Sequence, residues 1–229
     1  MFFDPVYFIF MLPGLILAGL ASFWVKTTFG RYSNVRAYSG MTGAQAAERM
    51  MRCNGVFDVR VEETRGFLAD HYDPSDKVLR LSPDVYGSSS LAAVGVACHE
   101  AGHAMQHADQ YVPLAVRSAL VPVTNFSSML AFYVFAAGFM FRPLLYVGCA
   151  LFAAALLFAL VTLPVEWDAS ARAKRHLAAA GVVSPGQERD AGRVLNAAFL
   201  TYLAGAVSSL LTLLYFLFRA GVIGGGRRD

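Results

Sequence analysis

The sequence predicts a mainly α-helical membrane protein with about four transmembrane helices and one small α+β domain. Of its 229 residues, 56% are hydrophobic and only 15% are charged, whereas soluble domains contain about a quarter charged residues. Four runs, 5–25, 118–141, 143–165 and 194–218, contain no charged residue and are each about long enough to cross a bilayer as a helix. A single extended polar region, 26–117, has room for a small folded domain.

The alternative interpretation of these runs is a set of buried core helices in a soluble protein, which four of them in so short a chain disfavour. The first run is predicted to be a retained anchor, because its start, MFFD, lacks the positive residues of a signal peptide and its apolar stretch is too long. The predicted organisation is an anchor at 1–25, a polar domain at 26–117, a transmembrane helical hairpin at 118–165, a helix at 166–193, and a last transmembrane helix with its tail at 194–229.

The polar region is expected to combine helices with a small antiparallel sheet. Thr42 can cap a helix that runs to Met51, and the serines at 88–90 can cap a later helix. Alternating apolar residues and turn-forming residues predict strands at 57–62, 67–72 and 78–81. An edge strand of such a sheet can bind an extended peptide through its backbone, or the strands can serve only to cover the later helix. The sequence leaves both roles open.

The later helix contains the most informative motif, His99-Glu100-Ala101-Gly102-His103. Four residues make about one helical turn, so both histidines project from the same face and can hold one zinc ion. Glu100 between them can act on a metal-bound water. A mid-helix glycine costs about 1 kcal/mol relative to alanine, so another backbone or a ligand is expected to approach closely at Gly102. The alternative is a helix with two surface histidines, and the motif favours a zincin-like domain.

Zinc needs a third protein ligand and an open position for water. His107 lies one turn further along, and a straight helix would spread three such ligands over about 12 Å, too far for one ion. Glu166 is the better candidate, because a carboxylate at the edge of an apolar helix is costly unless it binds something. Asp168 is its rival, with the simpler role of an i,i+4 partner of Arg172.

The donor that would stabilise the oxyanion of a peptidase reaction is not fixed by the sequence. His71 is the preferred candidate for this catalytic role, and a turn histidine that bonds Asp70 or Asp73 is the alternative. Tyr72 and Tyr202 are further candidates. His176 is discounted, because ten residues of helix place it about 15 Å from Glu166.

Basic residues near the ends of the spans predict the orientation in the membrane. Those on one side are Lys26, Arg31, Arg36, Arg172, Lys174 and Arg175, and those on the other are Arg142, Arg219, Arg227 and Arg228. The balance favours a cytoplasmic polar domain with both termini outside, although the basic residues of the tail oppose it.

Six segments together resemble the small bacterial membrane proteins of the neutral zinc metallopeptidase family, the YugP type. They are 39–44 (SGMTGA), 70–74 (DHYDP), 81–83 (LSP), 99–104 (HEAGHA), 164–170 (PVEWDAS) and 200–202 (LTY). The resemblance covers nearly the whole chain and implies a multi-pass protein of the bacterial inner membrane. The site is also similar to the gluzincin pattern of HtpX-type proteases, in which a glutamate on a later helix completes the zinc site and an aspartate often follows four residues on. Ser170 stands at that later position here.

The predicted function is that of a membrane-embedded zinc-dependent endopeptidase, with His99, His103 and Glu166 as Zn²⁺ ligands and Glu100 as the general base. Its expected partners are the lipid bilayer and polypeptide substrates, in particular loops or ends of membrane proteins. The alternatives are a metal-binding or adaptor protein without peptidase activity, which would not need Glu100, and a transporter, which would place charged residues within its spans. The net charge of +3 is too small to suggest nucleic-acid binding. Cys98 beside His99 is interpreted as a small buried thiol.

Overall fold

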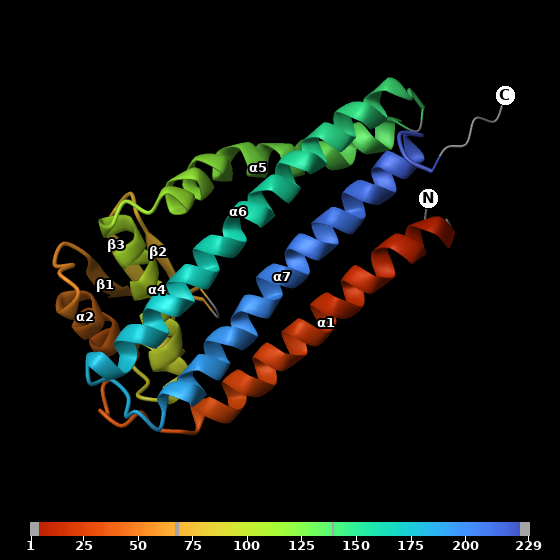
Figure 1. Ribbon diagram of the computed structural model, residues 1–229. Helices are drawn as coiled ribbons and strands as arrows, with labels where there is room; N and C mark the ends of the chain where they lie inside the picture. Colours follow the sequence, from red (N-terminus) through yellow and green to blue (C-terminus); the bar gives the residue numbers. More distant parts are fainter. Residues whose placement is uncertain (1–4, 67–68, 139, 225–229) are drawn as a thin grey trace. The chain divides into compact units, whose positions relative to one another are not determined.

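The computed structural model describes residues 5–66, 69–138 and 140–224. Its elements are α1 (Pro5–Ser33), α2 (Gly43–Cys53), β1 (Arg60–Glu63), β2 (His71–Asp73), β3 (Val78–Leu81), α3 (Pro83–Tyr86), α4 (Leu91–Ala108), α5 (Val112–Gly138), α6 (Pro143–Ala179) and α7 (Glu188–Arg219). All of them except the short α3 are labelled in Figure 1. The chain is therefore mainly helical, with one small sheet, as the sequence predicts.

In the described part of the chain, four helices are long and apolar enough to cross a membrane, namely α1, α5, α6 and α7. Large apolar side chains on them face outward, as Ile9 on α1 does with 70% of its surface exposed. Exposed apolar surface of this extent is typical of contact with lipid. Helices α1, α6 and α7 extend beyond the predicted charge-free runs, because hydropathy marks only the apolar part of a helix and backbone hydrogen bonding continues through polar residues. Helix α5 begins six residues before its predicted run 118–141 and ends at Gly138, three residues before the end of that run.

The chain forms two compact units. The first contains residues 1–21, 116–163 and 201–229, and the second contains residues 22–115 and 164–200. The core of the first unit is aromatic: Phe216 packs against Phe135 and Phe152, with ring centroids 3.6 and 4.5 Å apart, and Tyr215 meets Tyr7 edge-on at 5.3 Å. These contacts join parts of all four long helices through their side chains.

The sheet belongs to the second unit and has the strand order β1-β3-β2. The central strand β3 pairs antiparallel with β2 but parallel with β1, so the prediction of an antiparallel sheet was wrong for β1. Alternation of apolar and polar residues indicates a strand but not the direction of its partner. The short turn between β2 and β3 requires an antiparallel pair, whereas the longer connection that leaves β1 does not.

The strand boundaries differ from the prediction in two of three cases. Strand β3 begins and ends as predicted. Strand β1 runs from Arg60 to Glu63, so it begins and ends later than predicted, and Phe57, which opened the predicted alternation, is 77% exposed. Strand β2 is limited to His71–Asp73, and residues 67–68 of the predicted strand lie outside the described residues.

The caps of α2 and α4 are the predicted ones. The Thr42 hydroxyl accepts a hydrogen bond from the Gln45 N–H, and the Gln45 side-chain oxygen accepts one from the Thr42 N–H, which together form a capping box. The Ser90 hydroxyl accepts from the Ala93 N–H at the start of α4. Small buried residues of α2 and α4, such as Ala46 and Ala97, share one core, and α4 also contacts β2 and β3.

Candidate metal centre

Helices α4 and α6 bring three potential metal ligands together within the second unit. His99 and His103 lie one turn apart on α4, with their rings edge to face and centroids 4.9 Å apart. Glu166 lies on α6, which continues through Pro164 without ending at the predicted boundary. Its Oε2 is 3.1 Å from His99 Nε2 and 3.6 Å from His103 Nε2. Among the described residues, these three offer ligand atoms that all lie within 4.8 Å of one another.

The donor set fits a zinc ion in chemistry and in spacing. Two imidazole nitrogens and one carboxylate oxygen are common zinc ligands, and neighbouring ligand atoms in a tetrahedral site lie about 3.3 Å apart. The side chains of His99, His103 and Glu166 are 12%, 7% and 1% exposed, so water competes little for these atoms. Burying a carboxylate this deeply is costly without a cationic partner, which a bound metal would provide.

Negative charge gathers around His103. Burial alone would lower the pKa of His103, but the hydrogen bond to Glu166 and the charges of Glu100 and Glu166 hold that pKa above its usual value. The site therefore favours a cation, which can be a proton or a divalent metal.

The close approach expected at Gly102 is present. A Cβ atom at this position would lie 2.6 Å from the backbone oxygen of Ala169 on α6. The neighbour is backbone and cannot move aside as a flexible side chain can. Gly102 therefore allows α4 and α6 to come close enough for Glu166 to reach the two histidines.

We expect Gly102→Ala to destabilise the second unit and to reduce its zinc content, because the new methyl group must push α6 away from α4. The matched control is Gly95→Ala on the same helix, where a Cβ would find only ordinary contacts at 4.0 Å. That control should be neutral or stabilising by up to about 1 kcal/mol through helix propensity. Thermal unfolding and metal content measure both effects, and a Gly102→Ala protein with unchanged zinc would contradict this account.

Each histidine is oriented by a partner on its second ring nitrogen. His99 Nδ1 lies 3.1 Å from the Ser170 hydroxyl, and His103 Nδ1 donates to Gln106 Oε1 at 2.9 Å. Both Nε2 atoms are thereby turned towards Glu166. Such bonds fix the tautomer and the ring orientation of a metal-binding histidine. Ser170 thus contacts a candidate ligand from α6.

Gln106 also connects the two helices. It is completely buried, and its Nε2 donates to the Val165 carbonyl at 2.8 Å and to Asp168 Oδ2 at 2.9 Å. Asp168 also accepts from Arg172 Nε at 2.6 Å, as predicted, and Arg172 is bonded to Asp109 at the end of α4. Asp168 is therefore linked to His103 only through hydrogen bonds with Gln106, and it is not one of the three clustered ligands.

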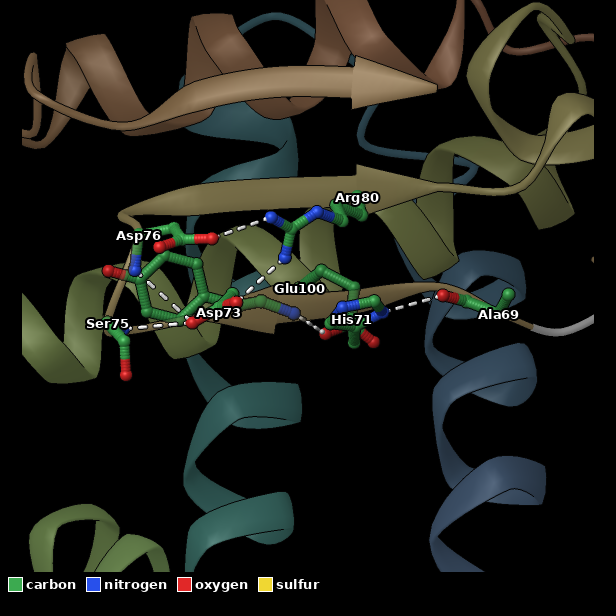
Figure 2. Close-up of polar contacts among 8 residues, drawn as sticks. Ala69, His71, Asp73, Ser75, Asp76, Arg80 and Glu100 are labelled. Atoms are coloured by element: carbon green, nitrogen blue, oxygen red, sulfur yellow. Dashed lines mark hydrogen bonds and ion pairs between the residues drawn. The ribbon is translucent and has the colours of Figure 1, made fainter. Parts of the chain in front are cut away.

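Glu100 is placed beside the cluster but outside it. Its Oε2 accepts a hydrogen bond from the backbone N–H of Tyr72 on β2 at 3.1 Å. Figure 2 shows Glu100 reaching β2 next to His71. Strand β2 is an edge strand, and the Tyr72 N–H points away from β3, so the outer edge of the sheet faces this glutamate.

The Tyr72 side chain attaches β2 to α4 a second time. Burial raises the pKa of Tyr72 to about 12, and the charges of Asp58 and Asp73 act in the same direction. The phenol therefore keeps its proton and can donate to His107 Nδ1, 2.7 Å away. His107 thus contacts Tyr72 and is not one of the three clustered ligands.

His71 is exposed and does not belong to the cluster. Its Nδ1–H donates to the Ala69 carbonyl at 2.7 Å, and the expected alternative bond to Asp70 or Asp73 is not the one formed (Figure 2). Asp70 instead binds Ser82, and Asp73 binds Arg80, whose hydrogen bond lowers the pKa of Asp73. With Nδ1 engaged, Nε2 of His71 donates only when the ring is doubly protonated. Its catalytic role stays a prediction.

The other residues weighed from the sequence are not among the three clustered ligands. Tyr202 belongs to the first unit, and His176 lies near the far end of α6. Cys98 is completely buried, as predicted, and burial raises the pKa of its thiol to about 12. A thiol with that pKa stays protonated at neutral pH, so Cys98 is not a nucleophile.

Sequence reasoning missed the orienting roles of Gln106 and Ser170 and the backbone bond to Glu100. The position of Gln106, three residues after His103 on the same helix face, was an available signal. The hydrogen bond from the Tyr72 N–H to Glu100 had no signal in the sequence, because a backbone N–H is present at almost every residue.

The helices and the site define a class: a protein with four helices able to cross a membrane and an H-E-x-x-H helix completed by a glutamate from a later helix. The sequence model of a family described as "Putative neutral zinc metallopeptidase" matches residues 7–221, and the chain belongs to this family. It is similar to the "Putative membrane protease YugP" of Bacillus subtilis (strain 168), with 46% identity over 213 residues, covering 92% of this chain and 95% of the relative. No solved structure matches the chain.

Proposed function

We propose that this protein is a zinc-dependent endopeptidase in which His99, His103 and Glu166 hold the metal and Glu100 is the general base. The observation that supports this most directly is the position of Glu100. It lies between two candidate ligands on the same helix, yet its carboxylate is bonded to the Tyr72 backbone and is not part of the ligand group. A protein that only stores or carries zinc has no need of a carboxylate there.

The residues divide the chemistry between them. Bound zinc supplies a water whose pKa is lowered to about 7 and a positive charge for the carbonyl oxygen of the substrate. Glu100 takes a proton onto a carboxylate oxygen and delivers it to the nitrogen of the leaving amine. Ser170 and Gln106 hold the Nδ1 atoms of His99 and His103, so that both rings present Nε2 to the metal.

The substrate that best suits this geometry is an extended peptide lying along β2. In the described part of the chain β2 pairs only with β3, so no strand covers its outer edge, and a peptide that pairs there would replace the Tyr72 N–H bond to Glu100. Glu100 lies at that edge, where its carboxylate accepts the hydrogen bond from the Tyr72 N–H. Backbone pairing would hold the scissile bond in register with little dependence on side chains.

We place the site at the cytoplasmic boundary of the bacterial inner membrane. Glu166 directly follows the charge-free run 143–165, and the basic residues of α6 begin six residues later at Arg172. The substrates in this proposal are loops or exposed ends of membrane proteins, which can reach a site at this depth in extended form.

The direct test is cleavage combined with metal analysis on the purified full-length protein. We expect about one zinc ion per chain, hydrolysis of an unstructured protein such as casein, loss of hydrolysis on chelation, and recovery when zinc is returned. Zinc bound tightly without cleavage of any peptide would favour the alternative function, a membrane metal-binding or adaptor protein.

The proposed orientation predicts that Ser75, exposed in the turn after β2, faces the cytoplasm. In a background without Cys53, Cys98 and Cys149, a Ser75→Cys protein should resist an impermeant thiol reagent in intact cells and react after permeabilisation. The matched control is Met140→Cys in the α5–α6 connection, where the residue is 94% exposed and the predicted side is outside. It should react in intact cells, and the reverse pattern would invert the topology.

A further inference from the structure

A groove in the second unit is lined by none of the candidate metal ligands and has no role in the proposed reaction. It has a volume of about 860 Å³ and lies between α1, α6 and α7. Its lining includes Trp24 and Arg31 from α1, Trp167 from α6, and Arg193 and Asn196 from α7. Tyr32 on α1 accepts a hydrogen bond from Arg193 at 3.1 Å and donates one to Asp190 at 2.8 Å, which fixes α1 beside α7 at the groove.

We propose that this groove binds the headgroup of an anionic membrane phospholipid. The first argument is its depth. Trp24 lies next to the end of the charge-free run 5–25, Trp167 follows the run 143–165 by two residues, and Asn196 lies at the start of the run 194–218. Three apolar runs therefore begin or end at the groove, which places it at the level of lipid headgroups. Tryptophan prefers this interface, and both tryptophans are 58% exposed.

The second argument is charge. Arg193 is balanced by Asp190 at 2.8 Å, but Arg31 has no carboxylate within ion-pair distance among the residues that the structure describes. Lys174 borders the groove, with its Nζ 2.5 Å from Asn196 Oδ1 and 5.7 Å from the centre of the Trp167 ring. Arg31 and Lys174 thus leave a surplus of two positive charges. Basic pockets between transmembrane helices are suited to anionic headgroups.

The third argument is the mixture of surfaces around those charges. Trp24, Trp167 and Phe199 give the groove apolar walls, with the Trp167 and Phe199 rings edge to face at 5.2 Å. Asn196 and the threonines at 27 and 28 add polar atoms. A phosphate with an attached glycerol and acyl chain matches this combination, whereas a free anion would leave the aromatic walls unused.

The chain provides its own reporter for the test. It contains two tryptophans, and both line the groove, so its tryptophan fluorescence reports directly on occupancy. We expect dioctanoyl phosphatidylglycerol, added to the purified full-length protein in a neutral detergent, to change this fluorescence saturably. Dioctanoyl phosphatidylcholine and inorganic phosphate should bind at least several-fold more weakly.

Variants on α1 separate a built site from general attraction to the membrane. Arg31→Gln should weaken phosphatidylglycerol binding by about fivefold, which is the effect of one basic charge near an anionic lipid. Arg31→Lys should retain most of the binding, which also controls for folding. Lys26→Gln removes the same charge from the same helix outside the groove lining and should leave binding unchanged.

Three results would overturn the proposal. They are no saturable response, equal binding of inorganic phosphate, which would indicate a free anion site, and equal weakening by Lys26→Gln and Arg31→Gln, which would indicate surface electrostatics alone. The readout needs neither zinc nor cleavage, so its outcome is independent of the proposed peptidase activity.

Discussion

Glu100→Gln is expected to lower the rate of peptide cleavage by about 100-fold or more, while zinc content stays unchanged. Glutamine has the same shape but cannot take up the proton, and Glu100 is not one of the three clustered ligands. Its amide oxygen can still accept the bond from the Tyr72 N–H, so β2 should stay attached to α4. Metal analysis and cleavage assays on the same preparation measure the two quantities.

Glu48→Gln on α2 is a suitable control, because Glu48 is partly exposed and its ion-pair partner is Arg52 on the same helix. It should retain both zinc and activity. A Glu100→Gln protein that lost zinc in parallel with activity would show that Glu100 acts as a ligand, and the assignment of the base would be wrong.

Glu166→Ala is expected to cause the largest loss of zinc. The variant removes a carboxylate that is 1% exposed and lies within 3.6 Å of both histidine Nε2 atoms. Asp168→Ala should reduce zinc affinity less, within the roughly 10–100-fold typical of a residue that orients a ligand, because Asp168 acts on His103 only through Gln106. His107→Ala should leave zinc nearly unchanged, because His107 contacts Tyr72.

These three variants are compared by metal content on purified protein, and Glu166→Gln keeps the side-chain volume in case the alanine variant folds poorly. Should Asp168→Ala empty the site while Glu166→Ala retains zinc, the third ligand is Asp168 and the comparison with gluzincins fails. Loss of zinc in His107→Ala would likewise show that α4 supplies a third histidine.

Local features of the sequence determined most of the helical architecture. Charge-free runs marked four long helices, and Thr42 and the serines at 88–90 marked the starts of α2 and α4, because apolar length and capping depend only on residues close in the chain. A glycine in the middle of a helix is unfavourable, so Gly102 likewise indicated that another group approaches closely there, although not which group. The role of Glu166 as a third ligand could be predicted, because a carboxylate beside an apolar run needs a partner.

The tertiary structure alone decided which groups surround the candidate ligands and how the sheet is paired. The backbone of Ala169 fills the space at Gly102, Ser170 and Gln106 orient the two histidines, and the Tyr72 N–H meets Glu100. The Ala169, Ser170 and Tyr72 contacts join residues 28 to 71 positions apart, and β1 pairs parallel with β3 across a strand that intervenes in the chain. Short-range patterns fix which face of an element is apolar, but the partner of that face follows from packing of the whole chain. The sequence therefore predicted a zinc site and the main residues that form it, and only the folded structure determined the geometry in which these residues meet.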